Sequence, residues 1–121
     1  MGEIATSNRQ ITLYYSSDSE RAKLTLAYAK AEGLAIQAID ILKTPLTGTQ
    51  IVELAKRLGI EVKDLINQDH PSYSSKFEPH ELSTDDWVKM IHHTPQIMKQ
   101  PIALHGDKTI LVETPSDMIK I

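Results

Sequence analysis

The sequence predicts an α/β fold in which one mixed four-stranded sheet carries helices on its faces. Three observations predict it: a strand–helix–strand unit near the N-terminus, a run of helices in the middle, and a strand hairpin near the C-terminus. A helical crossover between two strands implies a parallel pair, whereas a tight turn between strands implies an antiparallel pair. This order of elements fits a single sheet that contains both kinds of pairing.

The first strand is predicted at residues 10–15. Ile11, Leu13 and Tyr15 alternate with Gln10, Thr12 and Tyr14. A period of two, in a run rich in β-branched and aromatic residues, is typical of a strand with one buried face.

A helix follows a cluster of turn residues at positions 16–19. Ser17 and Glu20 have capping-box spacing, which predicts the start of the helix there. Gly33 is expected to end it, because the residue after a helix often needs a positive φ. The residues predicted to form the apolar face have helical spacing: Leu24, Ala27, Tyr28 and Ala31.

The apolar run from Leu34 to Leu42 is a strand or the tail of a helix by periodicity alone. The glycine before it and the Thr44-Pro45 pair after it favour a strand. This strand completes the predicted parallel unit.

The middle of the chain is predicted to be helical. Thr47 and Gln50 match a capping box, and Gly59 stops the helix that they begin. The apolar stripe of that helix consists of Ile51, Leu54, Ala55 and Leu58. A short helix is expected over residues 62–66, followed by a loop over residues 67–80.

A further helix begins near Ser83, since acidic residues follow at positions 85 and 86, and Pro95 ends it. Pro101 then leads into a strand over residues 102–104. A Gly106-Asp107 turn joins this strand to a second one over residues 108–112, and a last short helix is expected from Thr114.

This order of elements is the thioredoxin-like plan with a helical insertion. In that plan the active site lies in the first strand-to-helix turn, here residues 15–20. A proline before the hairpin, often in the cis form, frames the site, and Pro101 has that place. Residues 1–9 are expected to be a disordered tail and residues 10–121 a single domain.

Composition excludes several classes of function. The 121 residues include no cysteine, which removes disulfides, thiolate catalysis and thiolate metal ligation. The formal net charge of -3 argues against direct nucleic-acid binding by bulk charge. No apolar run suits a signal peptide or a membrane-spanning helix, so we expect a cytoplasmic protein without a membrane partner.

The five histidines show no metal-ligand spacing, because adjacent His92 and His93 point about 100° apart on a helix. We therefore expect neither a metal nor a cofactor. Ser19 lacks a G-x-S-x-G context and a base at defined spacing, so helix capping is the expected role rather than nucleophilic attack.

Four segments resemble, in order and spacing, the arsenate reductases that use glutathione or glutaredoxin, and the related Spx regulators. They are ITLYYSSDSERAKLTL, LKTPLTGTQIVELAKRLGIEVKDLI, STDDWVKMIHHTPQIMKQPIAL and LVETPSDM. The resemblance covers residues 10–119. It implies the thioredoxin-like fold. For family members that keep the catalytic cysteine, it also implies thiol-based reduction of an oxyanion.

The family's catalytic residues do not appear at the matching positions. Its nucleophilic cysteine falls on Ser19, a helix arginine on Lys23, and the arginine before the key proline on Gln100. The second cysteine of Spx falls on Ala22. A serine hydroxyl is a poor nucleophile at neutral pH without a base and cannot complete a thiol–disulfide cycle.

The resemblance therefore implies a catalytically inactive arsenate reductase-like protein that acts as a binding or regulatory module. The alternative is a thiol-dependent oxidoreductase that uses an external thiol. The residues expected to bind a small anion or a thiol ligand are Ser16, Ser17, Ser19, Glu20 and Pro101. By analogy with Spx, RNA polymerase is the expected kind of protein partner, and the glycine turn at Gly59 resembles the Spx contact.

Overall fold

A computed structural model describes residues 9–71, 73 and 82–121. The predicted tail lies outside the described residues except for Arg9, and so do residues 72 and 74–80 of the predicted loop over residues 67–80. The chain divides into two compact units, which we describe separately. The prediction that residues 10–121 form one domain stays a prediction.

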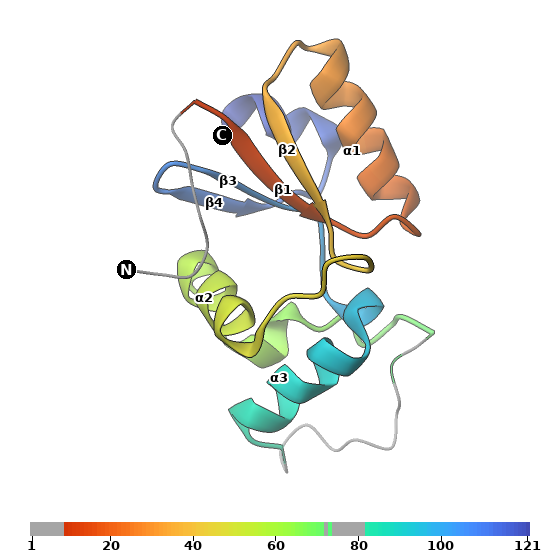
Figure 1. The fold of residues 1–121 in the computed structure, drawn as a ribbon, viewed down its shortest axis with the longest axis vertical. Helices are drawn as coiled ribbons and strands as arrows, with labels where there is room; N and C mark the ends of the chain where they lie inside the picture. The colour runs from red at the N-terminus through yellow and green to blue at the C-terminus, as the bar shows by residue number, and fades with distance from the viewer. Residues whose placement is uncertain (1–8, 72, 74–81) are drawn as a thin grey trace. The chain divides into compact units, whose positions relative to one another are not determined.

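The sheet unit comprises the described residues 9–44 and 100–121. Its four strands lie in the order β2-β1-β3-β4 (Figure 1). In chain order they are β1 (Ile11–Tyr15), β2 (Ile36–Asp40), β3 (Ile102–His105) and β4 (Lys108–Leu111). The β1–β2 pair is parallel, and β3 pairs antiparallel with both β1 and β4. The predicted mixed sheet is thus confirmed, and β2 is the strand that the sequence favoured over a helix.

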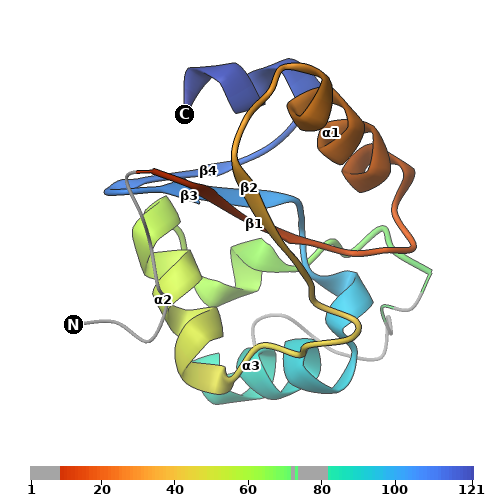
Figure 2. The same ribbon diagram turned by 45° about the horizontal axis from the view of Figure 1, so that its top comes forward.

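Two helices cover one face of this sheet, α1 (Glu20–Ala31) and the 3₁₀ helix η4 (Pro115–Lys120) (Figure 2). A core of apolar side chains fills the layer between these helices and the sheet. It consists of Ile11, Leu13, Ala29, Ala103, Val112 and Met118. Leu13, Ala29, Ala103 and Val112 are fully buried. Close packing of this layer fixes where α1 begins relative to the end of β1.

Strand β1 is buried on both faces, which differs from the alternating pattern that the sequence predicts. Thr12 is 4% exposed and Tyr14 is 4% exposed, although both alternate with the apolar set of Ile11 and Leu13. The reason is the position of β1 in the interior of the sheet, between β2 and β3. Interior strands in α/β folds are covered on both sides, so alternation in the sequence does not report exposure.

The predicted apolar face of α1 is wrong for three of its four residues, whereas the fourth, Tyr28, is partly buried and packs against the core. Leu24 is 59% exposed, and Ala27 and Ala31 are exposed as well. The buried residues are instead the small ones, Ala22, Thr25 and Ala29. Small side chains let the helix backbone approach the sheet closely, and Leu24 is left on the opposite side of the helix.

The helical unit comprises the described residues 45–71, 73 and 82–99. It contains two α-helices and two 3₁₀ helices: α2 (Gly48–Leu58), η1 (Val62–Leu65), α3 (Thr84–His93) and η3 (Pro95–Ile97). Thr47 and Gln50 form the predicted capping box, and Gly59 adopts φ 73° after α2. Ser83 caps α3 as predicted.

The apolar faces of these helices meet within the unit. Ile51 and Leu54 of α2 are fully buried, as are Leu65 of η1 and, to 2% exposure, Ile91 of α3. An isolated β-bridge pairs Ile66, the residue after η1, with Met98, the residue after η3. No helix among the described residues is both long and apolar enough to cross a membrane.

Candidate functional site

The candidate site is the loop that joins β1 to α1, at residues 16–19. The parallel register places Tyr15, the last residue of β1, opposite Asp40, the last residue of β2. The carbonyl oxygen of Tyr15 accepts the N–H of Ile41 at 2.8 Å. The loop and the end of β2 therefore emerge side by side from the same edge of the sheet.

Ser19, at the position of the family's cysteine, is the N-cap of α1. Its Oγ accepts the N–H of Ala22 at 3.3 Å, and its own N–H donates to the carbonyl oxygen of Ser16 at 3.0 Å. The predicted capping box between Ser17 and Glu20 is wrong, because α1 begins at Glu20 and its N-cap is Ser19 rather than Ser17. The predicted capping role of Ser19 is confirmed. Among the described residues, no hydrogen bond joins Ser19 Oγ to a carboxylate, an amine or a histidine.

Ser16 ties the loop to the strand that follows the proline. Its backbone N–H donates to Oε1 of Gln100 at 3.0 Å, and its hydroxyl donates to Oδ1 of Asp18. Ser16 is 1% exposed, so these groups are shielded from water. The peptide bond between Gln100 and Pro101 is cis, and Pro101 is buried. The predicted residues Ser16 and Pro101 thus lie near one another, because Gln100, which precedes Pro101, accepts the N–H of Ser16.

Asp40 is a site residue that the sequence analysis missed. Its Oδ1 accepts the N–H of Ser17 at 3.2 Å and the N–H of Leu42 at 3.0 Å. The residue is 8% exposed, and among the described atoms its buried Oδ2 has no hydrogen-bond partner. A charged residue at the end of an apolar run was the available signal. Only the parallel register shows that it faces the loop.

The pKa of Asp40 lies below its ordinary value. Burial acts to raise the pKa, but hydrogen bonds from the Ser17 hydroxyl and from the N–H groups of Leu42 and Ser17 outweigh it, with help from Lys43. Hydrogen bonds to a carboxylate favour its charged form. Asp40 is therefore a negative charge held beside the loop at neutral pH.

Lys23, at the position of the family's helix arginine, is turned toward an exposed acid. Nζ of Lys23 lies 3.7 Å from Oε1 of Glu20, and both side chains are largely exposed. Exposed pairs of this kind contribute little to stability. Asp18 and Asp40 place two further carboxylates at the loop.

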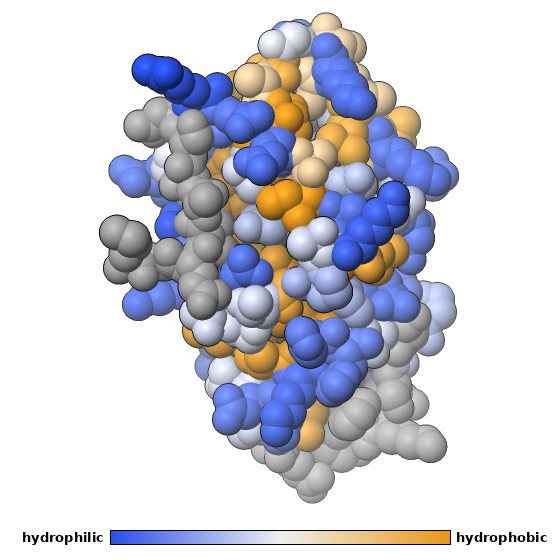
Figure 3. Space-filling view, viewed as in Figure 1, coloured by the Kyte–Doolittle hydropathy of each residue, from blue (hydrophilic) through white to orange (hydrophobic). Residues whose placement is uncertain are grey.

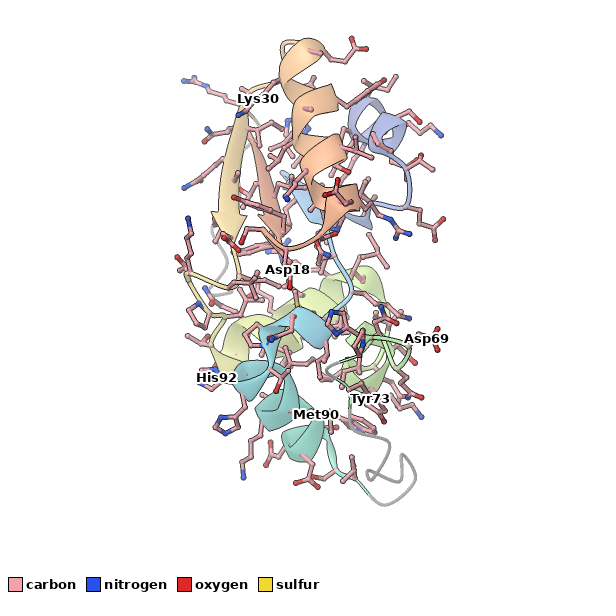
Figure 4. The ribbon with its side chains drawn as sticks, turned by 90° about the vertical axis from the view of Figure 1, so that its right-hand side faces the viewer. Asp18, Lys30, Asp69, Tyr73, Met90 and His92 are labelled. Atoms are coloured by element: carbon pink, nitrogen blue, oxygen red, sulfur yellow. The ribbon has the colours of Figure 1, made fainter. Side chains whose placement is uncertain are left out.

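The structure places no metal-binding group of three or more His, Cys, Asp or Glu side chains among the residues it describes. The adjacent imidazoles of His92 and His93 are exposed, with ring centroids 5.8 Å apart. Nδ1 of His92 lies 3.0 Å from the carbonyl oxygen of Leu46, which is a contact within the helical unit. Figure 4 shows His92 on α3.

Several backbone N–H groups that could hold an anion already have partners within the chain. Those of Ser16, Ser17, Ser19 and Ala22 donate to Gln100, Asp40, Ser16 and Ser19 respectively. An oxyanion needs such donors at the start of a helix. An anion that used these groups would first have to displace the side chains that hold them.

The sheet order, the cis peptide bond before β3 and the loop before α1 define the thioredoxin-like fold of the arsenate reductase type. Comparison with solved structures confirms this fold. A candidate arsenate reductase from Yersinia pestis superposes with a TM-score of 0.82 at 21% identity, over 92% of this chain and 99% of that one. An arsenate reductase from Vibrio cholerae gives 0.79 at 21% identity, over 93% and 98%.

The comparison with curated sequences finds a relative that matches over nearly the whole of both chains. The uncharacterised protein YfgD of Escherichia coli is 22% identical over 115 residues, which cover 93% of this chain and 97% of that protein. No family model matches the chain. The chain thus has the arsenate reductase-like fold that the resemblance implied, and it has no cysteine. What Ser16, Ser17, Ser19, Glu20 and Pro101 bind stays a prediction.

Proposed function

We propose that this chain is a catalytically inactive arsenate reductase-like protein that functions as a binding or regulatory module. The observation that carries the proposal is the state of Ser19. A hydroxyl stands where the chemistry requires a thiolate, and that hydroxyl accepts the N–H of Ala22 as a helix cap.

The chemistry of the loop supports inactivity in a second way. Reduction of arsenate through a protein thiol needs a nucleophile that can form and then exchange a bond to sulfur, and serine oxygen does neither at neutral pH. The chain has no other sulfur nucleophile, because it contains no cysteine.

The electrostatics of the loop also disfavour an oxyanion substrate. Arginine clamps bind oxyanions through paired, charge-assisted hydrogen bonds. Here Gln100 is a neutral acceptor for Ser16, and the ionised Asp40 takes the N–H of Ser17. A carboxylate in this position repels an incoming anion and competes for its donors.

The partner that we propose is a protein, and by analogy with Spx the first candidate is RNA polymerase. The turn at Gly59, with φ 73° at the end of α2, carries this analogy. A left-handed turn also serves simply as a helix C-cap. The partner therefore has to be identified by direct capture.

Activity is tested by arsenate reduction with glutathione and glutaredoxin, comparing the native chain with the variants Ser19→Ala and Ser19→Cys. We expect the native chain and Ser19→Ala to match the buffer blank. Incubated separately with oxidised glutathione, the Ser19→Cys variant should form a mixed disulfide by thiol–disulfide exchange that releases one reduced glutathione, as seen by mass spectrometry. Turnover by the native chain that Ser19→Ala abolishes would overturn the proposal and favour an oxidoreductase that uses an external thiol.

Binding is tested by capture from lysate at near-physiological salt and, separately, with purified RNA polymerase. We expect a stoichiometric partner in the capture. Binding to purified polymerase supports the Spx analogy, and a different stoichiometric protein replaces polymerase as the partner. Recovery of no stoichiometric protein in either experiment contradicts a protein-binding module.

A further inference from the structure

We draw no further inference here: the strongest candidate, the outward face of α1, where Leu24 is 59% exposed and apolar side chains lie among hydrophilic ones (Figure 3), carries no proposal, because nothing in the part of the chain that the structure describes shows what covers this face.

Discussion

Oε1 of Gln100 accepts the backbone N–H of Ser16 at 3.0 Å, across a sequence separation of 84 residues. The bond joins the loop before α1 to the cis peptide bond before β3. Gln100 occupies the position at which the resembling family has an arginine. A side chain that would face a substrate in that family is thus used here to hold the chain's own backbone.

Replacing Gln100 with alanine should destabilise the fold by about 1–2 kcal/mol, because it leaves the N–H of the buried Ser16 without its acceptor. Urea denaturation measures the change in the free energy of unfolding. The control is Gln37→Ala on β2, where the glutamine is exposed. Equal losses for the two variants would contradict a specific role for the Gln100 hydrogen bond.

Replacing Ser19 with alanine should cost about 1 kcal/mol, the usual penalty for losing an N-cap acceptor. The Ser19→Asp variant keeps an oxygen in reach of the N–H of Ala22, so it should retain most of the stability. Thermal and urea unfolding of the two variants check this order. A Ser19→Ala protein as stable as the native chain would show that the cap contributes nothing.

The stability of the native chain should fall with acid more steeply than that of an Asp40→Asn variant. The pKa of Asp40 is lowered in the folded state, despite burial, by hydrogen bonds from Ser17 and Leu42. A carboxyl whose folded pKa is lowered stabilises the fold above its unfolded pKa of about 3.9, and this stabilisation is lost as pH falls through the folded pKa.

Urea titrations at pH 7 and at several values below 4.5 test this difference. At pH 7 the native chain should be more stable than Asp40→Asn, and the gap should narrow as the pH falls. Asp86 and Asp117, whose pKa values are lowered chiefly by backbone hydrogen bonds, remain in both proteins. Their contributions cancel in the comparison. A gap independent of pH would show that ionisation of Asp40 does not stabilise the fold.

Replacing an alanine with leucine should lower the stability of the protein on one face of α1 and leave it almost unchanged on the other. Ala29 is fully buried in the sheet-unit core, so Ala29→Leu should destabilise the protein by about 1–3 kcal/mol through overpacking. Ala27 is exposed, so Ala27→Leu should change stability by no more than about 0.5 kcal/mol at low protein concentration. Similar losses for both would mean that the helix packs on the face containing Leu24.

Local sequence signals predicted most of the elements of this fold. The capping residues of α2 and α3 fixed their starts, and the glycines at positions 33 and 59 marked helix ends with φ 73° at each. These signals are local, because a cap or a glycine stop involves backbone groups only a few residues apart. A short stretch of sequence is therefore enough to predict them.

The face of α1 could not be predicted in this way. Leu24 and the small residues at positions 22 and 29 lie on opposite sides of the helix, and periodicity favours the larger side chain as the buried one. Which side is buried depends on how near the helix must come to the sheet. That distance is a property of tertiary packing and overrides the local preference.

Only part of the candidate site could be predicted, because one of its contacts also depends on tertiary structure. Ser19 and Gln100 were found because family resemblance pointed to their positions, and the structure adds their hydrogen bonds. Asp40 carries no local signal that links it to the loop. Its place follows from the register that sets it beside Tyr15.

Asp40 has one more consequence for any anionic ligand. Its carboxylate belongs to the same chain as Ser17, so it competes with a bound anion for the N–H of Ser17 at an effective concentration that does not fall on dilution. Phosphate or arsenate in solution has to displace the Asp40 carboxylate from the N–H of Ser17 and also to overcome its electrostatic repulsion. Anion affinity at this loop should therefore rise when the carboxylate at the end of β2 is removed.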